Sequence, residues 1–408
     1  MNLVLLKKTV NDLSYEFVER KGLGHPDTLS DGLAEYLSRQ YSLYTKEKFN
    51  AILHHNFDKV GLLGGSSSVG FGYGQLVKPI RVLLNGRAST KFAGEEINLR
   101  ELLIRWATNF MISNLPIKDP DTDLEFHYNL STQSSPGKIE ESKNIEKSPR
   151  KYWFEPRGFQ DIPELKRLFS NDTSMGVGFA PFSKLESAII FVESMLNGRN
   201  FKEKNPWIGS DIKIMGFKHE DDYEITICIP QIGSEVNSIE HYKKNLDIAR
   251  NTILEILQNH GIRNCNLSIN TRDNYESEEI YLTAIGSSIE SGDEGLVGRG
   301  NRIQGFISPM RPMSIEGAAG KNPVYHIGKI YYIAAQRISE SIYREFGIAN
   351  EVVLVSQSGR DLVDPWIVFA HLPEDCTMTQ EVESLIRREI QNIPKITEQL
   401  LEGKINIY

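Results

Sequence analysis

Two long stretches of the chain carry the apolar spacing of an amphipathic helix, and each ends at a glycine. One runs from Ile239 to His260 before Gly261, and the other runs from Lys329 to Phe346 before Gly347. Apolar residues three and four positions apart share one helix face, and a glycine just beyond the last of them is the usual helix stop. A further helix is predicted to begin near Pro26, because proline suits the first helical position.

Short segments rich in β-branched and aromatic residues predict strands around these helices. The predicted strands are Pro79 to Leu84, Tyr223 to Ile229, Asn266 to Asn270, Ile280 to Gly286, Val352 to Ser356 and Trp366 to Ala370. A shorter helix is predicted from Leu185 to Leu196. The strand from Tyr223, the helix from Ile239 and the strand from Asn266 form a strand–helix–strand unit. Similar mixtures flank it, so we expect a mixed α/β fold, and three such units fit 408 residues.

The composition excludes several classes of protein. A net charge of −8 is unsuited to sequence-independent nucleic-acid binding, which depends on Lys and Arg. No apolar run approaches the ~20 residues that span a bilayer, and the apolar stretch Leu3 to Leu6 is too short for a secretory signal. The cysteines Cys228, Cys265 and Cys376 lie far apart and form neither a disulfide framework nor a CxxC metal pattern. We therefore expect a cytoplasmic protein with reduced core thiols.

Between about Asp119 and Pro156 the sequence is polar and holds few aliphatic residues. Such a segment has little to bury against the entropy of ordering it, so a surface excursion is expected. Two interpretations remain open here. The segment is either a plain solvated insertion or a gate over an active site.

Two glycines precede the helix that begins near Pro26. Gly22 and Gly24 give the backbone freedom and exposed N–H groups that an anion site needs. Asp27 and Asp31 are four positions apart and share a helix face, and a carboxylate beside a phosphate site usually holds Mg²⁺. The alternative is that Asp27 complements the helix dipole and His25 lies near a cap.

The glycine-rich stretch from Gly61 to Gly74 also has two interpretations. Its backbone could approach a ligand closely, or it could simply form a hairpin. It matches neither a Walker A loop nor a dinucleotide-binding fingerprint.

The segment from Asp293 to Lys329 combines acids, glycines and cations. Its basic residues are Arg299, Arg302, Arg311, Lys321 and Lys329. The guanidinium of arginine presents a fork suited to phosphate oxygens, and an acid close by is typical of a metal–polyphosphate site. A solvated network of salt bridges is the alternative, but we favour polyphosphate binding.

Six motifs in order give the chain a specific family resemblance. They are Val18–Asp27 (VERKGLGHPD), His54–Asn56 (HHN), Asn171–Pro181 (NDTSMGVGFAP), Asp211–Lys213 (DIK), Gly298–Arg302 (GRGNR), and Gly320–Val324 (GKNPV) with His326 and Gly328–Tyr331 (GKIY). Each motif alone is weak, but six in order across most of the chain are highly specific. The chain resembles S-adenosylmethionine synthetase (methionine adenosyltransferase) of the archaeal type.

The resemblance implies a reaction and a fold. The family joins ATP and L-methionine to form S-adenosylmethionine, and then cleaves the leaving triphosphate to phosphate and diphosphate. Its fold is three similar α/β units around a pseudo-threefold axis. Two subunits bury flat sheet faces against each other and share active sites, assisted by two Mg²⁺ ions and often K⁺. For this chain we expect units near residues 1–150, 151–265 and 266–408, with boundaries that are approximate because such units are discontinuous.

The resemblance also implies roles for individual residues. His25, Lys213, Arg299 and Lys321 resemble the catalytic residues that surround the triphosphate and its leaving oxygen. Asp27 and Asp293 resemble the carboxylates that hold Mg²⁺. The residues expected to contact ATP or substrate are Glu19, Asp172, Arg302, Lys329, Ser131 and Ser134.

Two departures from the family pattern leave alternatives open. Gly300 stands where the common bacterial branch has a second cation, which we expect Arg302 to replace. Leu130 to Ser135 aligns with a glycine-rich nucleotide loop but reads LSTQSS. Two alternatives to methionine adenosyltransferase therefore remain: an enzyme that acts on a methionine analogue, and a catalytically silent nucleotide-binding paralogue.

Overall fold

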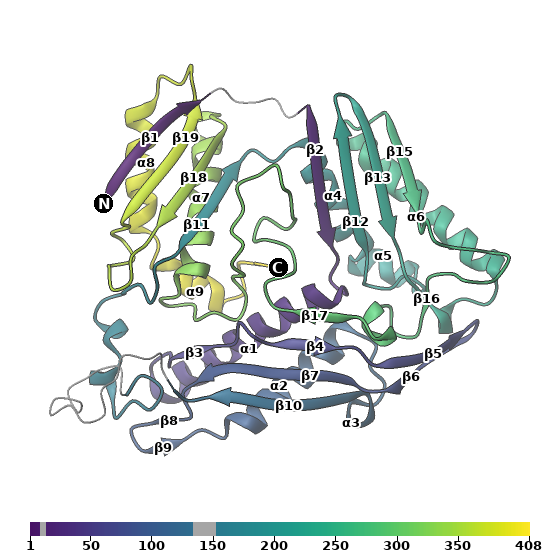
Figure 1. Ribbon diagram of the computed structural model, residues 1–408, viewed down its shortest axis with the longest axis horizontal. Helices are drawn as coiled ribbons and strands as arrows, with labels where there is room; N and C mark the ends of the chain where they lie inside the picture. Colours follow the sequence, from purple (N-terminus) through teal and green to yellow (C-terminus); the bar gives the residue numbers. More distant parts are fainter. Residues whose placement is uncertain (9–13, 134–151) are drawn as a thin grey trace.

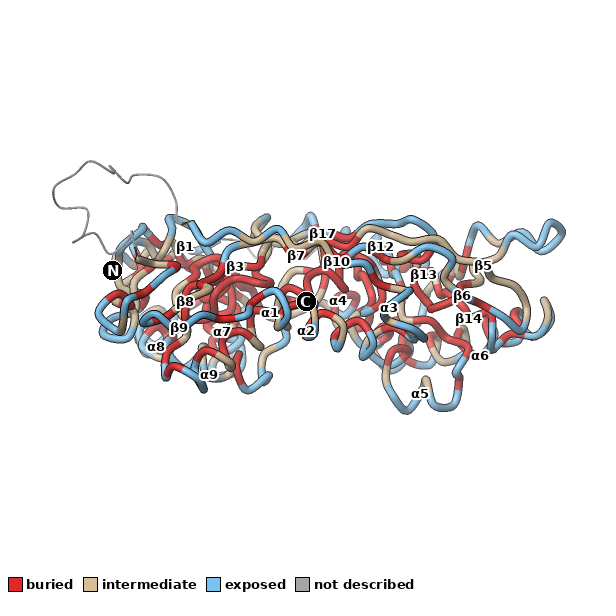
Figure 2. The backbone as a smooth tube through the Cα atoms, turned by 90° about the horizontal axis from the view of Figure 1, so that it is seen from below, coloured by how far each residue is buried: buried red, intermediate tan, exposed pale blue. Residues whose placement is uncertain are grey.

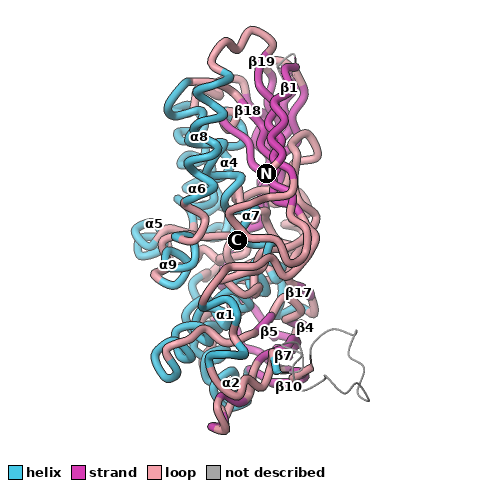
Figure 3. Tube along the Cα trace, turned by 90° about the vertical axis from the view of Figure 1, so that its left-hand side faces the viewer, coloured by secondary structure: helices cyan, strands magenta, loops and turns pink. Residues whose placement is uncertain are grey.

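The computed structural model describes residues 1–8, 14–133 and 152–408, and within these ranges the chain forms three sheets of four or five strands. The three sheets lie side by side in Figure 1, with helices behind them. Figure 3 shows the helices gathered on one side of the molecule and the strands on the other. Seen from below, the molecule is a flat slab with buried residues along its middle (Figure 2). One face of the slab is therefore helical, and the opposite face is formed by open sheet surfaces.

The first sheet lies in the lower part of Figure 1 and has the order β10–β7–β4–β17, with β3 also paired to β7. Its strands are β3 (His55–Asn56), β4 (Gly61–Leu63), β7 (Ile80–Ala88), β10 (Leu124–Ser131) and β17 (Glu294–Leu296). Helices α1 (Pro26–Phe49) and α2 (Leu99–Asn114) enclose a core with it that includes Leu33, Tyr41 and Trp106. The strand expected at Pro79 to Leu84 is confirmed within β7.

Strand β10 corrects the prediction for the polar segment. Its residues pair in parallel with β7, from Leu124 beside Ile80 to Ser131 beside Arg87. Leu124 is buried, and the apolar side chains at every second position after it pack on the same core. The expected surface excursion is therefore wrong for residues 124–131, because their two-residue alternation supplies one apolar face. Residues 134–151 lie outside the described residues, so both interpretations of that part stay predictions.

The second sheet has the order β15–β13–β12–β2. Its strands are β2 (Tyr15–Lys21), β12 (Lys213–His219), β13 (Asp222–Cys228) and β15 (Cys265–Ile269). Helices α4 (Lys184–Leu196) and α6 (Ile239–Asn259) share its core. Strands β13 and β15 are parallel and joined through α6, so the predicted strand–helix–strand unit is confirmed. The helix expected at Leu185 to Leu196 is confirmed as α4, which begins with a capping box between Ser183 and Glu186.

The third sheet has the order β1–β19–β18–β11. Its strands are β1 (Asn2–Lys8), β11 (Met175–Ala180), β18 (Asn350–Val355) and β19 (Ile367–Pro373). Helices α7 (Ile327–Phe346) and α8 (Thr379–Gln391) cover it, and α9 (Lys395–Leu401) packs between α7 and α1. Helix α7 ends at Gly347 with φ 70°, as the sequence predicted.

Short elements complete the described chain. They are the hairpin β5 (Ser66–Gly70) and β6 (Tyr73–Lys78), the pair β8 (Lys91–Phe92) and β9 (Glu95–Glu96), the pair β14 (Gln231–Ile232) and β16 (Leu282–Thr283), the helices α3 (Pro120–Asp123) and α5 (Arg199–Lys204), and 3-10 helices at Phe159–Asp161, Pro163–Leu165, Gly233–Glu235 and Ser288–Ser291. The glycine-rich stretch thus includes a hairpin. The strand expected at Ile280 to Gly286 is reduced to β16. No described helix combines the length and the apolar character needed to cross a bilayer.

The three units interleave along the chain. The first two strands of the sequence, β1 and β2, join the third and second sheets. Strand β11 joins the third sheet, and β17 returns to the first. Linear boundaries near residues 150 and 265 therefore describe only the bulk of each unit.

Helix α1 runs through the middle of this arrangement and is buried on several sides. Leu29, Leu33, Leu37 and Tyr41 form its apolar face, each with at most 1% exposure. Polar residues on its other faces are buried too, and hydroxyl groups there donate to carbonyls one turn earlier. Ser30 donates to Pro26 at 2.9 Å and Ser42 donates to Ser38 at 2.7 Å. Because buried polar groups need partners, these bonds allow a polar helix surface to lie in the interior.

A buried histidine and a buried carboxyl connect the segment around residues 153–164 to the first unit. His54 Nδ1 lies 2.8 Å from the Tyr325 hydroxyl, and His54 Nε2 lies 3.6 Å from Glu164 Oε2. The Trp153 ring stacks on His54 with centroids 5.4 Å apart. Burial lowers the pKa of His54 to about 4 and raises the pKa of Glu164 to about 7. Between these values both groups are neutral in the folded chain.

The pair predicts compensating effects of pH on stability. Between about pH 4.5 and 6.5 the unfolded chain has a charged histidine and a charged carboxylate, so unfolding moves one proton without net uptake. Glu164→Gln leaves only the histidine effect, so the free energy of unfolding should rise by up to about 1.4 kcal/mol per pH unit over this range, relative to wild type. His54→Gln leaves only the carboxyl effect and should give the opposite slope. Urea unfolding at a series of pH values measures both, and parallel curves for all three proteins would contradict the assignment.

Candidate active site

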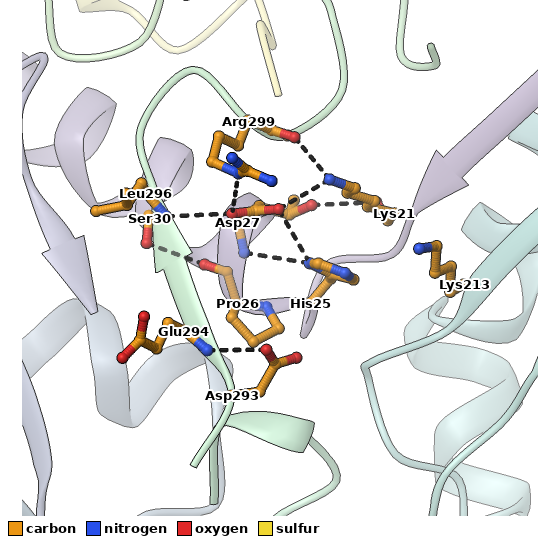
Figure 4. Close-up of polar contacts among 12 residues, drawn as sticks. Lys21, His25, Pro26, Asp27, Ser30, Lys213, Asp293, Glu294, Leu296 and Arg299 are labelled. Carbon is orange, nitrogen blue, oxygen red and sulfur yellow. Dashed lines mark hydrogen bonds and ion pairs between the residues drawn. The ribbon is translucent and has the colours of Figure 1, made fainter. Parts of the chain in front are cut away.

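A cavity of about 690 Å³ opens where the start of α1 meets the second sheet. Its wall includes His25, Asp211, Lys213, Tyr281, Ser288 and Asp293. Three of these, His25, Lys213 and Asp293, were predicted from the sequence, and Figure 4 shows them with Asp27 and Arg299 nearby. Residues from distant parts of the chain thus converge on one polar cavity, which is the usual property of a ligand site.

The turn before α1 lies against the strand-like segment Ser210 to Ile212. Gly22 N–H donates to the Ile212 carbonyl at 2.7 Å, and Gly24 N–H donates to the Ser210 carbonyl at 2.9 Å. A Cβ atom on Gly24 would lie 2.6 Å from the Ser210 backbone carbonyl carbon, so only glycine fits. The prediction that these two N–H groups are exposed for an anion is therefore wrong. The glycines instead bring His25 beside Asp211 and Lys213.

His25 is the N-cap of α1, and its Nδ1 accepts a hydrogen bond from Asp27 N–H at 3.2 Å. Burial lowers the pKa of His25, so the ring is neutral at pH 7. A neutral ring whose Nδ1 accepts a hydrogen bond carries its proton on Nε2. His25 therefore offers an N–H donor to a ligand in the cavity, and its capping role and its place in the site coexist.

Asp27 is held by groups from three parts of the chain (Figure 4). Its Oδ2 accepts from Lys21 Nζ at 2.8 Å, and its Oδ1 accepts from Leu296 N–H at 3.2 Å. The Arg299 side chain lies 3.9 Å from Oδ1 and is 71% exposed. Sequence reasoning quoted Lys21 within a motif but gave it no role. Its amine also donates to the Arg299 carbonyl at 2.7 Å, so it connects the two.

Asp211 is a site residue that sequence reasoning missed, although it lies in the quoted DIK motif. It is 3% exposed and accepts from Ser288 N–H at 2.9 Å and from the Ser288 hydroxyl at 2.6 Å. The same hydroxyl lies 2.9 Å from Asp293 Oδ2. Burial raises the pKa of Asp211, and the His25 ring opposes this rise. Asp211 and His25, which both line the cavity, therefore shift each other's pKa.

The cavity's lysine has an acidic neighbour. Lys213 opens β12, and its amine lies 3.3 Å from Glu19 Oε1 on β2. Its side chain is 45% exposed, so it stays accessible to a ligand. Glu19, which was expected to contact substrate, is thus close to the cavity through Lys213.

The other two predicted lysines form a separate buried cluster further along α1. Lys321 is 3% exposed and lies 3.2 Å from Asp58 and 3.0 Å from Glu316. Lys329 is fully buried, with its amine 2.6 Å from Glu35 and donating to the Lys321 carbonyl. Glu35 is eight residues after Asp27, or about 12 Å along the helix axis. The buried amine of Lys329 therefore holds the backbone of Lys321 in place through this hydrogen bond.

The remaining predicted residues lie outside the cavity wall. Asp172 is exposed and accepts from Thr173 N–H at 2.7 Å. Ser131 is exposed at the end of β10, and its hydroxyl accepts from Gln133 N–H at 3.2 Å. Ser134 lies outside the described residues. Arg302 donates to the carbonyls of Gly298 at 2.9 Å and Ile315 at 3.3 Å, so its guanidinium braces loops.

The carboxylates fit one particular kind of metal site. In the described part of the chain no three acidic, histidine or cysteine residues gather as a complete set of ligands. Asp293 is exposed at the cavity, whereas Asp27 is buried and its oxygens accept from Lys21 Nζ and Leu296 N–H. A metal bound by both would take the place of the Lys21 amine at Asp27. Mg²⁺ typically takes one or two carboxylates and completes its shell with phosphate oxygens and water. The donor set therefore suits a metal that arrives with a polyphosphate.

Comparison with known proteins identifies similar chains. Residues 4–146 and 157–404 match the S-adenosylmethionine synthetase (AdoMet synthetase) family. The chain is 36% identical to S-adenosylmethionine synthase of Hyperthermus butylicus over 414 residues, covering 98% of this chain and 97% of the relative. It is 38% identical over 408 residues to the probable S-adenosylmethionine synthase of Aquifex aeolicus, with 98% of each chain covered. The enzyme of Methanosarcina mazei is 36% identical over 411 residues, with 99% and 98% covered.

A solved structure shares the fold at low sequence identity. It is an unusual S-adenosylmethionine synthetase from Campylobacter jejuni, with a TM-score of 0.59 and 12% identity. The match covers 95% of this chain and 93% of the other. The arrangement of three sheets with helices on one face is therefore a known architecture.

The environment of His25 leads to a test of the cavity electrostatics. Burial has the largest effect on the pKa of His25 and lowers it; Asp211 opposes this effect, and Lys21 adds to it. Asp211→Asn should therefore lower the pKa of His25 further, and Lys21→Met should raise it. NMR titration of the protein with ¹⁵N-labelled histidine measures the midpoint, and His25→Gln assigns the signal. An unchanged midpoint in both variants would show that neither charge acts on the His25 ring.

Proposed function

The chain belongs to the S-adenosylmethionine synthetase family, and from this premise we propose how its residues carry out the family's reaction. The chain is a methionine adenosyltransferase, which makes S-adenosylmethionine, phosphate and diphosphate from ATP, L-methionine and water. One observation supports the assignment of the site most directly. The cavity of about 690 Å³ brings His25, Lys213 and Asp293 from three distant segments to one place.

The chemistry explains why such a set suffices. The methionine sulfur is an uncharged thioether, so its attack on the ribose C5′ requires no general base. The barrier comes from aligning sulfur, carbon and leaving oxygen, and from the charge that collects on the triphosphate. Positioning and preorganised cations address these two problems. Cleavage of the triphosphate in the second step uses the same cations.

We assign His25 to the leaving oxygen of the triphosphate. Its neutral ring offers Nε2–H, which suits an oxygen that becomes more negative as the C5′–O bond breaks. Lys213 and Arg299 supply positive charge to the phosphate groups from opposite sides of Asp27 and His25 (Figure 4). Asp211 lines the cavity, and its carboxylate opposes the effect of burial on the pKa of His25.

The family uses a divalent metal with ATP, and we propose that Asp27 and Asp293 hold Mg²⁺ here. When bound, Mg²⁺ would neutralise phosphate charge and stabilise the departing oxygen. Asp27 keeps its place through Lys21, and Asp293 keeps its place through Ser288. Two Mg²⁺ ions per site, and K⁺ beside them, follow the resemblance.

We further propose a homodimer that buries the open sheet faces. Several large apolar side chains on or beside these sheets are 41–50% exposed, namely Phe17, Met175, Met215 and Leu296. An apolar surface of this kind favours burial against a second copy. In such a dimer Asp172 and Ser131, which are exposed and lie outside the cavity of their own chain, are available to the partner's substrates. Lys321 would join them if a ligand displaced its pairs with Asp58 and Glu316. The free thiols Cys228, Cys265 and Cys376 suit a reducing compartment, so we place the enzyme in the cytoplasm.

The assay that tests this function follows all products of one reaction. The protein is incubated with ATP, Mg²⁺ and methionine, and S-adenosylmethionine, phosphate and diphosphate are measured. Equal amounts of the three are expected. Product with a methionine analogue but none with methionine would identify a different substrate.

The metal assignment predicts a changed Mg²⁺ requirement in two variants. Asp27→Asn and Asp293→Asn should each raise the Mg²⁺ concentration at half-maximal activity, because an amide lacks the charge that a hard dication favours. Asp247→Asn, on the exposed surface of α6, removes the same charge outside the cavity wall and is the control. Midpoints that match the control in both variants would exclude these carboxylates as metal ligands.

The dimer proposal predicts an effect of a charge on the open sheet face. Met215→Glu places a charge at a side chain that is 42% exposed on β12, so it should yield monomers in light scattering at micromolar concentration. Ile248→Glu alters a 37% exposed residue on α6, on the helical face, and should leave the dimer intact. A wild-type protein that is monomeric and active would contradict the shared sites.

A further inference from the structure

Two carboxylates on α1 hold the segment that carries Arg299. Asp27 accepts from Leu296 N–H at 3.2 Å, as described above. One turn further along the helix, Asp31 accepts from Gly298 N–H at 2.7 Å and from Gly300 N–H at 3.1 Å. The backbone on both sides of Arg299 is therefore fixed to one side chain.

Asp31 is set up for this task and not for binding a metal. It is 3% exposed, and within the described residues its hydrogen-bond partners are these two N–H groups. Burial raises the pKa of Asp31 to about 7, while the two backbone hydrogen bonds act in the opposite direction. Backbone N–H donors, which are fixed in place, occupy both oxygens of Asp31, whereas one oxygen of Asp27 is bound by a side-chain amine that can move away from a metal ion. The sequence interpretation that paired Asp31 with Asp27 beside Mg²⁺ therefore does not fit Asp31.

The glycine that departs from the bacterial pattern fits the same contact. A Cβ atom on residue 300 would lie 2.2 Å from Asp31 Oδ2, so any side chain there would push the carboxylate away. Gly298 has φ 89°, in the left-handed region that favours glycine. Gly300 therefore leaves the space that Asp31 needs, Gly298 allows the turn before it, and a second cation at position 300 would break the contact.

Other contacts fix the loop but leave the arginine side chain free. The Arg299 carbonyl accepts from Lys21, and the Asn301 side chain both donates to the Lys21 carbonyl at 2.8 Å and accepts from Lys21 N–H at 3.0 Å. The Arg299 guanidinium itself is mostly exposed. A rigid backbone places the exposed guanidinium of Arg299 where it can bind a phosphate, so the loop does not have to be ordered again in each turnover.

We propose that Asp31 is the positioning residue for Arg299, holding the backbone at residues 298 and 300 so that the guanidinium meets the polyphosphate in a fixed place. This inference rests on the proposed function of Arg299. It goes beyond that function, because Asp31 touches no substrate and acts through another residue.

A double-mutant cycle tests the proposal. Asp31→Asn exchanges one oxygen for an NH₂ group that faces an N–H donor, so it should lower kcat roughly tenfold to a hundredfold and change the KM for methionine little. Arg299→Leu should lower kcat by roughly 10²–10³. The double variant should equal Arg299→Leu alone, because Asp31 has nothing left to position. Multiplying effects in the double variant would overturn the proposal.

Controls separate positioning from stability. Asp161→Asn removes another buried carboxylate that accepts from a backbone N–H, here of Arg157, and should lower the melting temperature without lowering kcat. Gly300→Ala breaks the same contact from the loop, because its Cβ atom would clash with the Asp31 carboxylate. It gives a second measurement if Asp31→Asn does not fold. It should also lower kcat, and its effect should shrink in an Asp31→Ala background, where the clash is absent. Undiminished loss of kcat there would overturn the proposal.

The series also separates this inference from the proposed function. A folded wild-type protein that forms no S-adenosylmethionine would remove the function on which Arg299 depends. An active wild type with multiplying effects leaves the enzyme assignment intact and removes only the role of Asp31. Hydrolysis of tripolyphosphate alone gives an independent readout, because the same arginine meets the same chain of phosphates.

Discussion

The fold and the site both depend on backbone N–H groups that donate to two carboxylates in the interior. Asp27 and Asp31 accept three such bonds from residues 267 to 269 positions away in the sequence. Bonds to an ionised acceptor are stronger than neutral ones, and a buried carboxylate without them is costly. These bonds attach α1 to the segment that returns from the second unit, and they bring β17 to the edge of the first sheet. Arg299 and Asp27, the carboxylate proposed to bind the metal, are placed by the same contacts.

Helix α1 connects two groups of charges that the sequence interpretation treated as one. Its first turn carries His25 and Asp27 at the cavity, and its middle carries Glu35 to the amine of Lys329. The helix can do this because its buried polar side chains bond to its own backbone or to neighbouring loops. A single rigid element therefore sets the separation between the cavity and Lys321.

The sequence predicted those parts of the structure that rest on local patterns. Helices α1, α6 and α7, and the parallel pair β13 and β15, follow from apolar spacing and from glycine stops. Strand β10 was missed because polar residues on one face concealed the alternation. Asp211 was missed because its role arises from packing against Ser288, which lies 77 positions away. The burial of Lys329 and the contact between Asp31 and Gly300 depend in the same way on long-range packing, which the motifs do not contain.

The pairing of β1 with β19 has a consequence for how the protein is made. These strands run in parallel, from Asn2 beside Ile367 to Lys8 beside Pro373. Strand β1 is therefore synthesised long before β19, its partner in the sheet. Contacts between such distant residues raise the contact order, which slows folding. While the chain is being synthesised, the apolar strand Asn2–Lys8 is an unpaired edge that is open to incorrect association. The third sheet can therefore be completed only after β19 has been synthesised.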